Sequence, residues 1–357
     1  MNKRDITLLK KHLKLENSAI SNVCGCMVNA NGEKIFDFKE NFLNRSDDDA
    51  EKYLKLIKKV FSNKIGDNTM MTGFTTQEET AGEHYDMLKR LRETKLGDEN
   101  LLNDFYDKVI ETADFSENYL ILLFHDTYDI PGEEDSLDVH EFITCLFCPM
   151  KLSADVLGYD SVDQQIAKVP RANIVNAPVA GFSFPAFSDK ETDMHSIILY
   201  SKKAKEPETE FLCDVTGCEY KRTATQKRIE IANQMAFAFG EETEDIAAKF
   251  MKELYLRYEI EENAKMELTV RLIGEVLDEI YGKRKEETDM FLEAFNKSFD
   301  NESVFVSEII DLAMVEKANA MERKERLRIL LDQCVKQIEN TSGANDVTEE
   351  IKASFLK

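Results

Sequence analysis

The chain has 357 residues, of which 43% are hydrophobic and 32% are charged, so it can bury the core of one large or two modest domains. Its formal net charge of −23 disfavours nucleic acid and anionic membranes as partners, and nucleic-acid binding would require a local basic face. No apolar run reaches the roughly 18 residues of a transmembrane helix. Because no apolar signal segment follows the basic start of the chain, we expect a cytoplasmic protein without a membrane partner.

The first part of the chain predicts a helix, a hairpin and a second helix. Apolar residues at near-helical spacing indicate a short amphipathic helix over residues 3–14. Two strands, at 22–29 and 34–38, flank Asn31-Gly32, a dipeptide typical of the two-residue type I′ turn. A serine followed by three aspartates then predicts the capped start of a helix over about 46–61.

The next segment leads to a central hairpin. A strand is predicted at 70–76 and helices at 78–94 and 98–113, with Gly97 suited to the left-handed residue that often follows a helix end. Residues 118–152 then hold two short apolar runs separated by a polar loop. Such runs are typical of strands that are buried on both faces, and adjacent strands are most simply paired antiparallel. This hairpin is the element around which we expect the sheet to be organised.

Beyond the hairpin the pattern first becomes irregular and then helical. A short helix is predicted near 161–168, and 202–210 is typical of a charged loop. The aromatic residues of 181–187 predict rings on one face of an extended segment, and 194–200 predicts the last strand. From about residue 223, helical spacing of apolar residues covers 225–239, 243–260, 266–281, 285–299, 303–318 and 320–339.

These patterns predict an α+β fold with two domains. Residues 1–218 form a mostly antiparallel sheet domain flanked by helices, and residues 219–357 form an all-helical domain, with a linker at 340–345 before a short terminal helix. The apolar stripes of the C-terminal helices predict packing within the chain or against a second copy. We therefore expect a protein partner or self-association.

The cysteines allow one metal-site hypothesis. Six of the seven form close pairs along the chain: Cys24 and Cys26, Cys145 and Cys148, Cys213 and Cys218. A four-thiolate zinc site would require the first two pairs to meet in space. Within strands, however, a C-x-C pair shares one face, whereas the thiols of a C-x₂-C pair point to opposite faces. Reduced, buried packing thiols are therefore favoured over zinc or redox chemistry, and no cofactor is expected.

The candidate catalytic residues lie at one end of the hairpin. His125 and Asp126 end its first strand, and His140 begins the second. A histidine beside a carboxylate can serve as a general base, and hairpin pairing would bring His140 towards them. No Gly-x-Ser-x-Gly elbow, H-E-x-x-H motif or phosphate-binding loop accompanies these residues. A role in anchoring the loop is therefore favoured over a hydrolase-type active site.

Two groups of basic residues stand out in the C-terminal half. They are Lys221, Arg222, Lys227 and Arg228, followed by Arg323, Lys324, Arg326 and Arg328. Glutamates interleave the second group, and an acidic stretch that could pair with either group lies nearby. We therefore expect solvated faces rather than phosphate-binding ones.

Four segments resemble the bacterial family catalogued as domain of unknown function 4317. They are the start MNKRDITLLKKHLK, residues 23–29 with Gly32, residues 118–131 of the hairpin with Cys148-Pro149-Met150-Lys151-Leu152, and residues 181–187. The resemblance covers about residues 1–200 and fades beyond about 220. The family has no established activity, so the resemblance supplies no catalytic residues.

The layout also resembles, more distantly, the bacterial 37-kDa nucleoid-associated proteins. That likeness rests on architecture alone, which is a weak basis for function. We expect a non-enzymatic interaction protein, with nucleoid association as one form of it. A hydrolase-type enzyme and a small zinc-binding protein are the alternatives.

Overall fold

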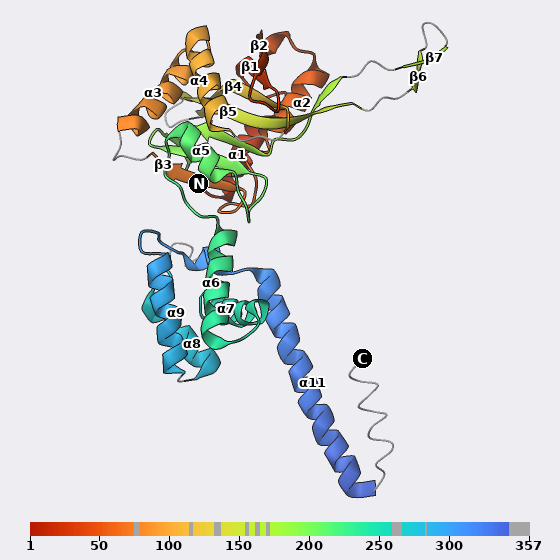
Figure 1. Cartoon of the computed structure of the whole chain (residues 1–357), viewed down its shortest axis with the longest axis vertical. Coiled ribbons are helices and arrows are strands. Elements are labelled where there is room, and N and C mark those ends of the chain that lie inside the picture. The colour runs from red at the N-terminus through yellow and green to blue at the C-terminus, as the bar shows by residue number, and fades with distance from the viewer. Residues whose placement is uncertain are drawn as a thin grey trace. The chain divides into compact units, whose positions relative to one another are not determined.

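The computed structural model describes residues 1–74, 79–113, 117–131, 137–153, 157–160, 165–168, 172–258, 266–282 and 284–342. The chain divides into two compact units, Met1–Thr223 and Ala224–Lys357. The first combines a sheet with helices and the second is helical, which confirms the predicted α+β class (Figure 1). Residues 343–357, which hold half of the predicted linker and the predicted terminal helix, lie outside the described residues.

The first unit is built on an eight-stranded sheet with the order β2-β1-β4-β5-β9-β12-β3, in which β8 pairs with the end of β5. All of its paired strands are antiparallel. The strands of this sheet are β1 (Ile20–Val28), β2 (Lys34–Asn41), β3 (Thr69–Gly73), β4 (Tyr119–Pro131), β5 (Leu137–Leu152), β8 (Asn173–Val175), β9 (Ala180–Phe184) and β12 (Ser196–Ser201). Two further pairs lie outside it: β6 (Leu157–Asp160) with β7 (Gln165–Lys168), and β10 (Ala186–Ser188) with β11 (Glu191–Asp193).

The predicted central hairpin is confirmed as β4 and β5. Their register runs without a break from the pair Tyr119–Pro149 to the pair Pro131–Leu137. Successive residues of β4 point to opposite faces of the sheet, so Leu123 packs in the core on one side and Leu122 packs in the core on the other. Burial on both faces explains why the run is continuously apolar rather than alternating.

Helices cover both faces of the sheet. The helices α3 (Glu79–Glu93), α4 (Glu99–Thr112) and α5 (Thr209–Thr216) pack on the side that Leu123 faces. The helices α1 (Lys3–His12) and α2 (Asp47–Ile57) pack on the side that Leu122 faces. Ser46 caps α2 as predicted, because its side chain accepts from the Asp49 amide.

Two turns differ from their predicted form. In the β1–β2 hairpin only Gly32 has a positive φ, of 78°, so the turn is not type I′. Instead, the Asn29 side chain accepts from two backbone amides of the turn, an arrangement that asparagine favours. After α3, the positive φ angles belong to Lys95 and Leu96 rather than Gly97.

Three further predictions are corrected. The helix predicted near 161–168 is wrong over 165–168, which form β7, while 161–164 lie outside the described residues. The end of the predicted charged loop 202–210 is also wrong, because residues 209–210 form the start of α5. The rings of Phe182 and Phe184 share a core, but Phe187 lies in the opposite one, because it belongs to β10 rather than β9.

The second unit consists of packed helices around a core that includes the fully buried Phe250 and Phe291. They are α6 (Ala224–Phe239), α7 (Thr243–Arg257), α8 (Val270–Tyr281), α9 (Lys285–Ser298), α10 (Val306–Ile309) and α11 (Leu312–Ser342). The two helices predicted over 303–318 and 320–339 are wrong in their division, since α11 is continuous through residue 319. No helix in the described part of the chain has the length and apolarity to cross a membrane.

Candidate functional site

A cleft in the first unit concentrates positive charge. It has a volume of about 720 Å³, and its described lining residues include six lysines and no carboxylate. These lysines are Lys10, Lys55, Lys58, Lys59, Lys64 and Lys202, and together they define what we call the lysine cleft. In a chain with a net charge of −23, this is the local basic face that an anionic ligand would require.

Segments far apart in the sequence build the lysine cleft. Lys10 lies in the last turn of α1, and Lys55 lies in the last turn of α2. Lys58 and Lys59 follow directly after α2, and Lys202 follows β12. The cleft therefore depends on the packing of α1 and α2 against the sheet, which places these segments side by side.

Hydrogen bonds fix the backbone around the cleft. The Thr69 hydroxyl donates to the Val60 carbonyl and accepts from the Ser62 amide, at 2.8 Å each. The Asn68 side-chain amide donates to the carbonyls of Ser201 and Lys202, at 2.9 Å each. These bonds tie the loop after α2 to the end of β12, so the lysines project from a fixed backbone.

The lysine charges are largely uncompensated. Lys55 forms an ion pair with Glu51 at 2.9 Å, whereas the other five have no ion pair among the described residues. Burial, followed by repulsion from the Lys59 ammonium, lowers the pKa of Lys10. The carboxyl ends of α1 and α2 each contribute roughly half a negative charge, which offsets only part of the positive charge of the lysines. The remaining positive field is available to an anion.

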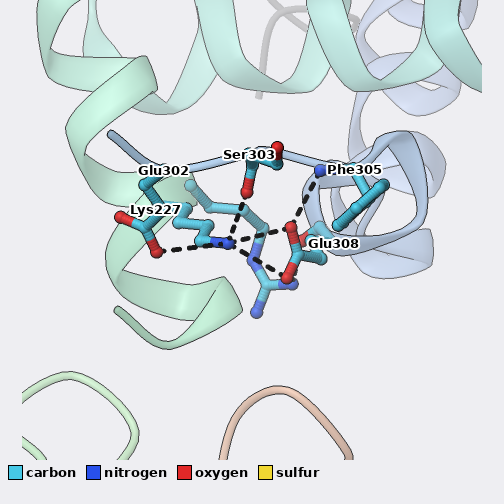
Figure 2. Close-up of polar contacts among 6 residues, drawn as sticks. Lys227, Glu302, Ser303, Phe305 and Glu308 are labelled. Atoms are coloured by element: carbon cyan, nitrogen blue, oxygen red, sulfur yellow. Dashed lines mark hydrogen bonds and ion pairs between the residues drawn. The ribbon is translucent and has the colours of Figure 1, made fainter. Parts of the chain in front are cut away.

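The two basic groups noted in the sequence do not form such a site. Lys227 is 4% exposed, and its ammonium lies 3.0 Å from Glu308 and 3.3 Å from Glu302. Figure 2 shows this ammonium directed at both carboxylates and at the Ser303 carbonyl, which accepts at 3.1 Å. Lys227 is thus a buried structural cation, contrary to the solvated face that we expected. On α11 the basic group does lie on exposed helix, where Arg326 pairs with Glu322 at 3.8 Å.

The structure does not gather the candidate catalytic residues around one pocket. His125 and Asp126 are consecutive in β4, so they point to opposite faces of the sheet. The His125 ring is fully buried with its Nδ1 at 2.8 Å from the Ser21 hydroxyl, and burial lowers its pKa. His140 shares a face with Asp126, but its Nδ1 lies 3.4 Å from the Thr192 hydroxyl.

Asp126 instead pairs with His12, a residue that sequence reasoning did not select. The Nε2 atom of His12 on α1 lies 2.7 Å from Oδ2 of Asp126, and the His12 ring stacks on Tyr128. The adjoining cavity has a volume of only about 10 Å³, which is at the lower limit for a single water molecule. The pair therefore anchors α1 to the sheet and has no room for a substrate.

The four thiols of the zinc hypothesis are not brought together. Cys24, Cys26 and Cys145 lie on the sheet face covered by α3 and α4, whereas Cys148 lies on the opposite face. This is the arrangement that alternation along a strand predicts for a C-x₂-C pair. Among the described residues, no group of three or more His, Cys, Asp or Glu could hold a metal ion.

Comparison with known proteins identifies a family. No curated protein and no solved structure matches the chain, and none of the comparisons shows a relation to the nucleoid-associated proteins. A family model described as a domain of unknown function, DUF4317, matches residues 1–339. The match reaches into the last part of α11, so the expectation that the resemblance fades near residue 220 is wrong. The chain belongs to the DUF4317 family of domains of unknown function.

Proposed function

We propose that the chain is a non-enzymatic interaction protein that binds clustered phosphate groups in the lysine cleft. The observation that carries this proposal is the presence of six lysine ammonium groups around one cleft whose described lining contains no carboxylate. Lysine binds phosphate as a point charge with rotatable donors, so several lysines on a fixed backbone suit a ligand with several phosphates.

The lining favours the recognition of phosphate over the recognition of bases. The one aromatic residue among the described lining residues is Tyr200, which is 7% exposed and therefore offers no face for base stacking. Contacts to phosphate position a nucleic acid without reading its sequence. The ligand chemistry is thus a run of phosphates, supplied either by the backbone of a single-stranded nucleic acid or by a free oligophosphate.

A fluorescence-anisotropy titration with a labelled single-stranded oligonucleotide tests the proposal at low salt. Lys58→Gln/Lys59→Gln removes two cleft charges, each worth about 1 kcal/mol at 4 Å from a phosphate in water. The affinity should fall about thirtyfold in this variant. The control Lys324→Gln/Arg328→Gln makes the same change in charge on α11 and should alter the affinity by less than about threefold.

Competition by inorganic tripolyphosphate identifies the source of the phosphates. If tripolyphosphate displaces the oligonucleotide, the cleft accepts free oligophosphates. If the oligonucleotide binds through Lys58 and Lys59 but resists displacement, the extended backbone is the ligand. The proposal is refuted if neither ligand binds at low salt, or if the cleft variant and the α11 variant lose the same affinity.

A further inference from the structure

A second pair of cysteines, outside the zinc hypothesis, lies within reach of disulfide formation. The Sγ atoms of Cys213 and Cys218 are 3.5 Å apart, and both residues are buried, at 8% and 5% exposure. Cys213 lies in the last turn of α5, and Gly217 ends this helix with a φ of 70°. The Gly217 backbone N–H donates a hydrogen bond to the Cys213 carbonyl. The left-handed turn folds Cys218 back towards the helix.

Secondary structure positions the backbone of both cysteines. The backbone of Cys218 forms an isolated antiparallel β-bridge with Phe74, and the amide of the next residue, Glu219, donates to the Gly73 carbonyl at 2.8 Å. Cys213 therefore lies in a helix, and Cys218 lies in the segment after that helix, which pairs with the residue that follows β3. A covalent S–S bond of about 2.05 Å requires the sulfur atoms, now 3.5 Å apart, to approach by about 1.5 Å.

The environment makes Cys218 the more reactive of the two thiols. The hydrogen bond between the two sulfur atoms lowers the pKa of Cys218 and raises that of Cys213, and the Thr216 hydroxyl lies 3.1 Å from the Cys218 sulfur. Burial instead raises the pKa of Cys24 to about 11 and that of Cys148 to about 12. Because the thiolate is the reactive form, oxidation is expected to select Cys218 over the four strand thiols, Cys24, Cys26, Cys145 and Cys148, which we call the core cysteines.

We propose that Cys213 and Cys218 form a reversible disulfide when a hydroperoxide oxidises the protein. The Cys218 thiolate attacks the terminal peroxide oxygen, the O–O bond breaks, and the departing oxygen takes up a proton, which leaves a sulfenic acid on Cys218. The Cys213 sulfur then attacks the Cys218 sulfur, the S–O bond breaks, and hydroxide leaves with the Cys213 proton as water. Two thiols and one H₂O₂ thus give one disulfide and two waters, and a dithiol reductant reverses the change.

Peptide mapping of the full chain tests this assignment directly. Trypsin cleavage after Lys205 and Lys221 releases residues 206–221, which hold both cysteines and no third one. Cys334→Ser serves as the background, because it removes the exposed thiol. After H₂O₂ treatment, denaturation and alkylation, this peptide should carry no alkyl group and be lighter by two hydrogens, and dithiothreitol should restore both alkylation sites. The core cysteines should stay alkylated and react at least about tenfold more slowly.

Single variants then assign the roles of the two sulfur atoms. In Cys213→Ser, the sulfenic acid on Cys218 has no partner and should be trapped by dimedone, whereas Cys218→Ser should give little trapping at Cys213. The alkylation of residues 206–221 in the chain that keeps both cysteines decides the proposal, even if a single variant folds poorly. Double alkylation of residues 206–221 at a peroxide dose that oxidises Cys334 in the native sequence would overturn it, as would preferential oxidation of the core cysteines.

Discussion

Replacing Lys227 by methionine should destabilise the helical unit strongly. The Lys227 ammonium contacts Glu302, Glu308 and the Ser303 carbonyl at 3.0–3.3 Å, and the residue is 4% exposed. Removing one partner of a buried ion pair costs about 3–5 kcal/mol, because it leaves an uncompensated buried charge. Here the carboxylates retain some access to solvent, and Glu308 keeps its bond from the Phe305 amide at 2.8 Å. We therefore expect a loss of about 2–3 kcal/mol in the free energy of unfolding.

Arg271→Met provides the matched control in the same unit. The Arg271 guanidinium lies 2.9 Å from Glu275 and is 90% exposed, so its removal should cost about 0.5 kcal/mol or less. Native-state hydrogen exchange of peptides from α6 and α10 measures the local free energy of opening under increasing urea. If Lys227→Met costs less than about 1 kcal/mol, or no more than Arg271→Met, the buried ion pairs of Lys227 do not hold α6 to α10 and the segment before it.

Three further changes test the stability of the first unit. His125 is kept neutral by burial, and its pKa in the folded state lies below the usual 6.5. Its contribution to stability is therefore complete above about pH 6.5 and is lost as the pH falls, so His125→Asn should flatten the fall in melting temperature between about pH 7 and 5. An unchanged slope would contradict this. Gly25→Ala places a methyl group 2.3 Å from the Phe38 ring, and a loss of about 1–3 kcal/mol should be seen in urea melts. Gly217→Ala combines a φ of 70° with a contact of 2.8 Å to His84, and it should lower the melting temperature, whereas the helical Gly274→Ala should not.

Much of the fold follows from local pattern. The apolar runs of residues 118–152 predict the central hairpin because strands that are buried on both faces must be continuously apolar. Alternation along a strand also predicts that Cys145 and Cys148 point to different faces, as they do. The break assigned after residue 318 is wrong because Asn319 is tolerated inside a helix that lacks Gly or Pro at that point.

The candidate site depends on tertiary packing that the sequence does not display. Lys10 and Lys202 are separated by most of the first unit, and only the packing of α1 beside the end of β12 places them around one cleft. A partial signal is present, since the segment 52–64 carries several lysines in an otherwise acidic chain. One of the basic groups along the sequence contains Lys227, whose acidic partners lie more than 70 positions away and neutralise its charge. Clusters of like charge along a sequence are thus a poor guide to a binding face when their partners are distant.

The salt dependence of oligonucleotide binding tests the lysine cleft most directly. If each of the five lysines without an ion pair neutralises one phosphate, one counterion per lysine is released from the oligonucleotide. The slope of the logarithm of the binding constant against the logarithm of the salt concentration should then be about −3.5 for a single strand. Lys58→Gln/Lys59→Gln should change this slope to about −2, while Lys324→Gln/Arg328→Gln should leave it unchanged. A slope near zero, or a slope that the cleft variant does not alter, would contradict the assignment of the lysine cleft as a phosphate-binding site.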